Sequence, residues 1–131
     1  MTVFLHANTQ GGGGGTSSAP DVQTTRGQAT SVPINAETTV VQRVVPLGYT
    51  MKLHGLVPSG NADAEWFLYD DATEVFRFRR AVHDHEPFTW ANPISVTAGH
   101  TLSLRVVHQT ADQIAGSTTR NFYGALIFRD A

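Results

Sequence analysis

Apolar and polar residues alternate along most of this chain with the two-residue period of a strand that buries one face. The clearest example is the stretch Asn92–His108, in which Leu102, Leu104 and Val106 occupy every second position. Gly99, in the middle of this stretch, can adopt the positive φ that a tight reversal between two strands requires. Two neighbouring strands that share an apolar face need a second sheet to cover it, so the stretch predicts a β-sandwich.

The same alternation recurs along the chain and predicts about eight strands. Turns are expected at Pro58–Asn61 and at Asp70–Thr73, where proline, glycine, asparagine and aspartate gather. No segment keeps a 3.6-residue apolar period over three turns, so we expect an all-β fold. Short strands at this spacing favour a jelly-roll-like antiparallel sandwich over an immunoglobulin-like one. The expected strands cover Ser31–Asn35, Thr38–Val45, the later part of Val44–Val57, Glu65–Tyr69, Glu74–Arg80, Phe88–Thr97, His100–Gln109 and Arg120–Arg129.

Residues 1–28 differ in composition from the rest of the chain. A short apolar group, Val3, Phe4 and Leu5, precedes the five-glycine run Gly11–Gly15 and a series of small polar residues. Glycine loses the most backbone entropy on ordering, so this composition predicts a flexible linker. The alternative is a terminus without a role. The exposed apolar group favours an arm that binds a partner, so we expect an arm over 1–28 and one β-sandwich domain over 29–131.

Composition narrows the function classes. A chain of 131 residues is long enough for one domain with its own core, and it contains no cysteine that could form a disulfide. Its apolar runs are too short to span a bilayer, and its first residues lack the features of a signal peptide. The net charge of −2 argues against nucleic acid and anionic membranes as partners. All basic residues except Lys52 are arginine, which fits either a binding surface or a GC-rich genome.

The sequence His83–Glu86 (HDHE) groups side chains that are able to bind metal. Histidines at i and i+2 of a strand could share an ion, as they do in cupins, with His108 as a distant ligand. However, the glutamate follows His85 directly instead of three or four residues later, and Pro87 ends the run. We therefore favour a polar loop and expect neither a metal nor another cofactor.

Other candidate chemistry is weaker. The glycine run lacks the Lys-Ser/Thr that follows in a phosphate-binding loop, and the sequence shows no nucleophile elbow or Ser-His-acid set. We therefore expect a protein that is not an enzyme. Three arginines, Arg77, Arg79 and Arg80, alternate in part with phenylalanines. This pattern could mark a nucleic-acid platform, but the negative net charge favours a face that contacts another subunit.

Four stretches together resemble the small jelly-roll structural proteins of tailed bacteriophages, and most of all their capsid decoration (cement) proteins. The stretches are VVPLGYTMKLHGL, EWFLYDDATEVFRFRR, PISVTAGHTLSLRVVH and NFYGALIFRD, and the resemblance covers about residues 40–131. It implies a β-sandwich without catalytic residues, often a homotrimer, that binds the major capsid protein on the outside of a phage head and reinforces it.

The resemblance further implies assembly in the host cytoplasm, a final location on the virion surface, and a terminal arm that clasps a neighbouring subunit. Residues 1–28 would supply that arm. A receptor-binding or tail-tip domain of a phage tail is the first alternative, because such domains also have a sandwich fold and also form oligomers. A cupin-like metal-binding protein is the second.

Overall fold

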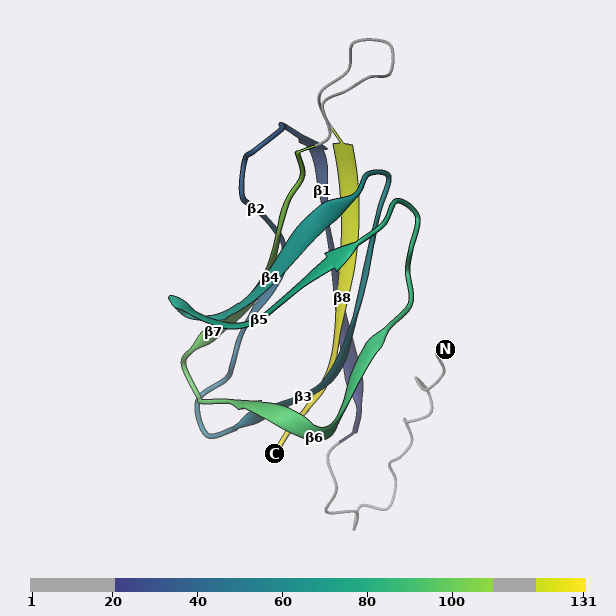
Figure 1. The fold of residues 1–131 in the computed structure, drawn as a ribbon. Coiled ribbons are helices and arrows are strands. Elements are labelled where there is room, and N and C mark those ends of the chain that lie inside the picture. Colours follow the sequence, from purple (N-terminus) through teal and green to yellow (C-terminus); the bar gives the residue numbers. More distant parts are fainter. Residues whose placement is uncertain (1–20, 110–119) are drawn as a thin grey trace.

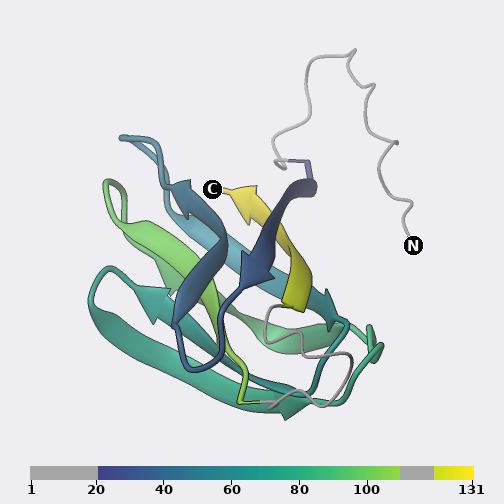
Figure 2. The ribbon, with the colours of Figure 1, turned by 90° about the horizontal axis from the view of Figure 1, so that it is seen from above.

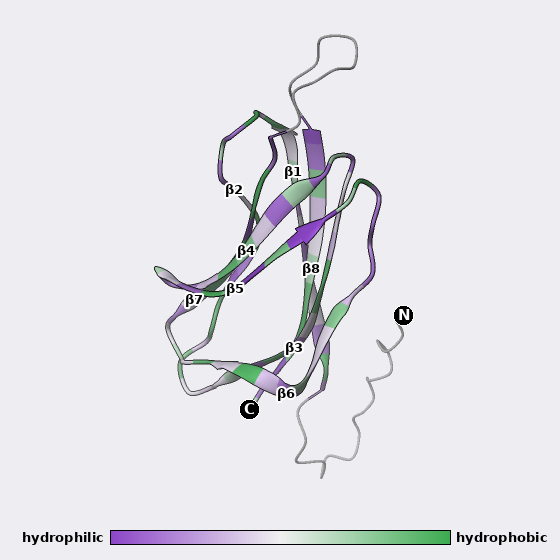
Figure 3. Ribbon diagram, viewed as in Figure 1, coloured by the Kyte–Doolittle hydropathy of each residue, from purple (hydrophilic) through white to green (hydrophobic). Residues whose placement is uncertain are grey.

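The computed structural model of the protein describes residues 21–109 and 120–131. This part of the chain is all β, in agreement with the prediction, and contains no helix of the length and hydrophobicity that a membrane crossing requires. Hydrophilic and hydrophobic residues follow one another along its strands (Figure 3). The eight strands are β1 (Gln23–Val32), β2 (Thr38–Val44), β3 (Met51–Gly60), β4 (Ala64–Asp70), β5 (Thr73–Arg80), β6 (Phe88–Val96), β7 (Thr101–Val107) and β8 (Arg120–Asp130).

The strands form two four-stranded sheets that pack as a sandwich (Figure 1). Sheet A has the order β1-β8-β3-β6 and sheet B the order β2-β7-β4-β5. Every neighbouring pair is antiparallel. The first strand pairs with the last, the second with the seventh, the third with the sixth and the fourth with the fifth, which is the nested pairing of a jelly roll. The predicted fold class is confirmed.

The core lies between the sheets and is formed by the alternate residues that the sequence pattern marks as apolar. In β7, Leu102, Leu104 and Val106 are fully buried. In β8, every second residue from Phe122 to Phe128 points inward, and both phenylalanines are at most 1% exposed. Burying side chains of this size contributes about 1.5–3 kcal/mol each, so this shared interior is the main source of stability.

The sandwich is thin along one side because two inward-facing glycines let the sheets approach closely. Gly27 of β1 lies opposite Gly124 of β8 in the register of sheet A. A Cβ at Gly124 would lie 3.1 Å from Leu104 Cδ2 and 3.2 Å from Val40 Cγ1, and a Cβ at Gly27 would collide with the carbonyl oxygen of Val40. A side chain at Gly27 would therefore clash with the backbone, and one at Gly124 would force the neighbouring side chains of Leu104 and Val40 to move.

Aromatic rings fill the opposite side, between the edge strands β5 and β6. Phe76 of β5 makes edge-to-face contacts with Phe88 and Trp90 of β6, with ring centroids 5.4 Å apart in both pairs. Phe78 lies 4.5 Å from Phe88 and stacks on Trp66 in the core. The bulk of these rings closes the side of the sandwich that is bordered by the edge strands β5 and β6.

Some predicted boundaries differ from the structure. The strand expected over Ser31–Asn35 is instead the end of β1, which stops at Val32, and a turn follows at residues 34 and 35. β1 already begins at Gln23, so the part of the predicted arm from Gln23 to Gln28 is a strand paired with β8. The predicted turn at Pro58–Asn61 comes too early, since β3 continues to Gly60. Pro58 is tolerated there because the pairing of β3 with β6 ends at Leu56, so beyond it β3 has a neighbour on one side only.

Candidate functional site

Three turns meet at one end of the sandwich, and we call this region the three-turn end. They are residues 45–50 between β2 and β3, 71–72 between β4 and β5, and 97–100 between β6 and β7 (Figure 2). Backbone hydrogen bonds join the first and third turns: the Val45 amide donates to the His100 carbonyl at 2.9 Å, and the Gly99 amide donates to the Val45 carbonyl at 2.8 Å. Gly99 has φ 83°, as the predicted reversal requires.

The three-turn end exposes large apolar side chains. Leu47 is 82% exposed, Val44 is 59% exposed and Tyr49 is 49% exposed. All three belong to the end of β2 or to the turn that follows it. Single exposed apolar residues are normal on a protein surface, but several in one turn indicate a contact surface.

A histidine and two carboxylates link the second and third turns. His100 Nδ1 lies 2.7 Å from Asp70 Oδ1 and 3.6 Å from Asp71 Oδ2. The hydrogen bond with Asp70 raises the pKa of His100, and the charge of Asp71 adds to the effect. The three side chains offer ligand atoms within 4.8 Å of one another. However, they already bond one another, and Asp71 accepts from the Thr101 amide, so we assign them to holding the turns together.

Both ends of the described sandwich lie at the three-turn end. Gln23, the first residue of β1, lies opposite Phe128 near the end of β8. Thr50 and Ala131 exchange two backbone hydrogen bonds, of 2.9 and 2.8 Å. The chain therefore enters the sandwich at the same end as the exposed Leu47 turn. The predicted binding residues Val3, Phe4 and Leu5 lie outside the described residues.

The structure separates the three arginines that the sequence predicts as a contact face. Arg77 and Arg79 point outward from sheet B, where Glu65 lies 3.6 and 3.8 Å from them and Glu74 pairs with Arg77 at 2.9 Å. The Arg80 side chain is only 9% exposed, pairs with Asp84 and lies over the ring of Phe88. A subunit-contact role can therefore involve Arg77 and Arg79 on one surface, but not Arg80 on the same surface.

The histidines of the HDHE sequence lie in the polar loop between β5 and β6, as predicted. His83 and His85 are exposed, whereas His108 is fully buried and its Nε2 lies 2.7 Å from the Val32 carbonyl oxygen. In the described part of the chain these histidines do not belong to a group of three metal-binding side chains. Asp84 organises the loop instead, because it binds Arg80 and accepts from the Glu86 amide.

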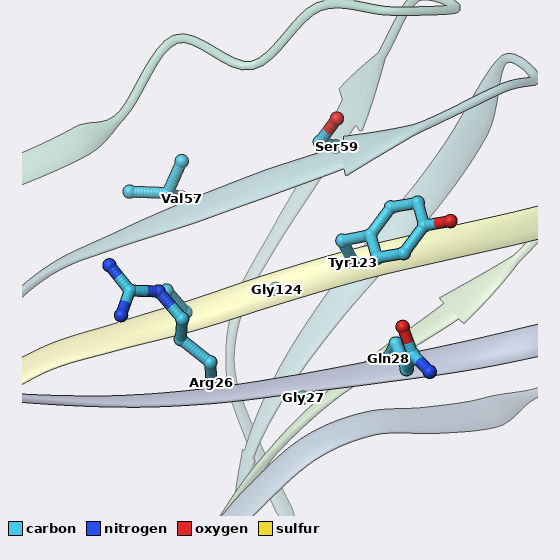
Figure 4. A pocket seen from close by; sticks show the side chains of 8 residues that line it. Arg26, Gly27, Gln28, Val57, Ser59, Tyr123 and Gly124 are labelled. Atoms are coloured by element: carbon cyan, nitrogen blue, oxygen red, sulfur yellow. The ribbon is translucent and has the colours of Figure 1, made fainter.

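A second surface feature, which we call the sheet-A groove, lies on the outer face of sheet A. It has a volume of about 500 Å³ and runs over β1, β8 and β3 (Figure 4). The backbone of Gly27 and Gly124 and the methyl group of Ala125 form its floor. Its sides are formed by larger residues of all three strands, namely Arg26, Gln28, Val57, Ser59 and Tyr123.

The sequence pattern did not single out this groove. Tyr123 and Ala125 are the residues of β8 that alternate with the buried ones, and Arg26 and Gln28 fall in the predicted arm. The available signal was the small size of Ala125 next to an outward-facing tyrosine. That signal becomes readable only once the neighbours of β8 are known, because the groove is made by three strands distant in sequence.

Comparisons with known proteins assign no family. No protein-family model matches the sequence, and the sequence matches no curated protein. Among solved structures, the chain is similar to the crystal structure of PirA, with 12% sequence identity and a TM-score of 0.43 over 78% of this chain and 92% of that chain. A likeness of this degree carries no inference on function, and the resemblance to phage decoration proteins stays a prediction.

Proposed function

We propose that this protein is a non-enzymatic structural component of a phage virion that binds the outside of the head shell and reinforces it. The observation that supports this proposal is the three-turn end. It exposes Leu47, Val44 and Tyr49 at the same end of the sandwich at which the chain enters β1. The apolar turn and the segment that precedes the sandwich can therefore act on the same partner surface.

The energetics fit a protein that works in many copies. Complete burial of Leu47 or Tyr49 against a shell would contribute about 1.5–3 kcal/mol each, before the cost of association is subtracted. One such contact is weak. Copies related by the symmetry of a shell or of a trimer multiply it into strong overall binding.

The segment before the sandwich has a separate part in the proposal. Val3, Phe4 and Leu5 would bind a neighbouring subunit, either as a strand added to an open sheet edge or as side chains in an apolar depression. The sandwich offers such edges, because among the described strands β1, β6, β2 and β5 each have only one neighbour within their sheet. Replacing Phe4 by aspartate would weaken attachment to the shell and leave the sandwich folded.

The decisive experiment uses shells of the same virus that lack this protein. Full-length protein is added to them, and the occupancy is measured by co-sedimentation and cryo-electron microscopy. We expect Leu47→Asp and Tyr49→Ala to lower occupancy several-fold at subsaturating concentration. Tyr123→Ala serves as the matched control, because Tyr123 is 46% exposed and Tyr49 is 49% exposed. Wild-type occupancy of Leu47→Asp would refute a role for the three-turn end.

Oligomerisation is tested separately in solution. We expect a homotrimer in native mass spectrometry at micromolar concentration, with subunit contacts that include Arg77 and Arg79 of sheet B. Charge reversal at Arg79 should then reduce the trimer fraction. A strictly monomeric spectrum of the wild-type protein would contradict the trimer, while binding to shells would still be measured by the occupancy experiment.

A further inference from the structure

The sheet-A groove has the construction of a ligand site rather than of a plain strand surface. Its floor is apolar and made of small residues, which leaves a hollow of about 500 Å³. Volumes of this order, with an apolar lining and a few polar groups, are typical of small-molecule sites. Tyr123 rises from β8 between the neighbouring strands β1 and β3, and its ring borders the hollow (Figure 4).

Within the described part of the chain, polar side chains around the groove have unused hydrogen-bonding capacity. Arg26 and Gln28 of β1 and Ser59 of β3 flank Tyr123. Among residues 21–109 and 120–131, the Arg26 guanidinium has no carboxylate partner, in contrast to Arg43, Arg77, Arg79, Arg80 and Arg105, which all have one. A guanidinium donates up to five hydrogen bonds and matches a carboxylate with two of them.

The electrostatics of sheet A favour an anion. Its four strands contain a single carboxylate, Asp130, which pairs with Arg43 of sheet B instead of facing the groove. The outer face presents Arg26, Lys52 and Arg129. The acidic residues of the other sheet, such as Glu65 and Glu74, neutralise arginines there. A protein with net charge −2 therefore carries one sheet face that is positively charged.

We infer that the sheet-A groove binds a saccharide that bears a carboxylate group. The Tyr123 ring would stack on the apolar C–H face of a sugar ring, for which an exposed ring with a polar tip is suited. Gln28 and Ser59 would exchange hydrogen bonds with sugar hydroxyls, and Arg26 would pair with the carboxylate. The apolar floor accommodates the sugar without requiring further hydrogen bonds from it.

The groove fits other ligand classes less well. Single-stranded nucleic acid needs successive aromatic rings and cations that follow a row of phosphates, whereas this groove offers one exposed ring and one cation in its lining. An extended peptide would add to a sheet edge, but the middle of the groove is β8, which already pairs with a strand on each side.

The saccharide site does not depend on the proposed role on the shell. Tyr123 lies on the outer face of sheet A, whereas Leu47 and Tyr49 lie in the turn between β2 and β3. The two surfaces can therefore be inactivated separately. Loss of saccharide binding with normal shell occupancy, or the reverse, identifies which of the two proposals fails.

The test uses fluorescently labelled full-length protein on an array of neutral, carboxylated and sulfated glycans. The same array carries a dT12 oligonucleotide and a peptide of residues 1–10. We expect retention on carboxylated glycans, with affinities then measured by calorimetry on the retained compounds. Tyr123→Ala should lower the affinity for them about tenfold. Arg26→Gln should lower it about tenfold for carboxylated glycans and leave their neutral analogues nearly unchanged.

Two variants control for charge and for aromatic area. Arg79→Gln removes an exposed guanidinium from sheet B, and Tyr49→Ala removes a tyrosine of matching exposure. Both should bind glycans like the wild type. The inference is overturned if no glycan is retained above the Tyr123→Ala background. It is also overturned if Arg26→Gln weakens the binding of neutral and carboxylated glycans equally. The same holds if only the oligonucleotide or the peptide binds in a way that depends on Tyr123.

Discussion

Breaking the ion pair between the two sheets should destabilise the sandwich far more than replacing both partners. Arg43 of β2 binds Asp130 of β8 through two hydrogen bonds, of 2.9 and 2.7 Å. The two side chains are only 17% and 11% exposed, and the Arg43 guanidinium lies 4.2 Å from the centroid of the Phe128 ring. Neither charge has enough water around it to remain solvated alone.

The magnitude follows from this geometry. Removing one partner of a fully buried pair costs about 3–5 kcal/mol, and the residual exposure of this pair lowers the expected cost to about 2–3 kcal/mol for Arg43→Met or Asp130→Leu. Methionine keeps an apolar contact with Phe128, so the change isolates the charge. The double variant leaves no unpaired charge and should cost about 1 kcal/mol or less. The coupling energy of the cycle is then about 3–5 kcal/mol.

The measurement is urea unfolding followed by tryptophan fluorescence, since Trp66 is 1% exposed and reports on the core. In thermal unfolding followed by the same signal, each single variant should lower Tm by about 7–12 °C for a domain of this size. Arg77→Met is the control, because the pair that Arg77 forms with Glu74 is exposed and its loss should change stability little. Additive effects of the two single substitutions, or single losses as small as the control, would refute the reasoning.

Three further predictions concern packing and titration. Gly124→Ala should lower the free energy of unfolding by about 1–3 kcal/mol, and Val40→Ala should restore part of this loss, because the new methyl would meet Val40 Cγ1 at 3.2 Å. If Gly124→Ala left the stability in urea unfolding unchanged, the close approach of the sheets would be contradicted. In an NMR titration His100 should have a pKa above 6.5, so its contribution to stability is present below pH 6.5 and is lost as the pH rises through the raised pKa. Asp70→Asn should lower the pKa of His100, and an unchanged pKa would exclude the hydrogen bond as the cause of the shift. His54 should titrate below pH 6.5, because burial and the charge of Arg129 both lower its pKa, so its contribution to stability is present above pH 6.5 and is lost as the pH falls through the lowered pKa. Arg129→Gln should raise the pKa of His54, and an unchanged pKa would leave burial as the sole cause of the shift.

The alternation of residues predicted the strands well, because a buried face leaves a period of two in the sequence. It also predicted the reversal at Gly99 and the polar loop that contains His83 and His85. It did not reveal that Gln23–Gln28 form a strand. This segment contains small and polar residues, and its strand conformation depends on pairing with β8, about a hundred residues later.

The surfaces were harder to predict for the same reason. Arg79 and Arg80 are adjacent in sequence, yet a strand turns them to opposite faces, and only the sandwich decides which face is buried. The sheet-A groove depends on which strands flank Ala125, and β-bulges such as the one between Leu53 and Gly55 shift the alternation along β3. Local periodicity carries no information on these long-range pairings.

The nested pairing has a consequence for the order in which the fold can form. Gln23 finds its partner Phe128 only after about a hundred further residues have been synthesised, so sheet A cannot acquire its inner strand β8 until that strand leaves the ribosome. Before that point β1 and β3 lack the strand that joins them, while the hairpin of β4 and β5 is already able to pair. Folding should therefore start from that hairpin and proceed slowly, as expected for a topology of high contact order. A nascent chain stalled before β8 would expose the apolar interior to the chaperones of the cell.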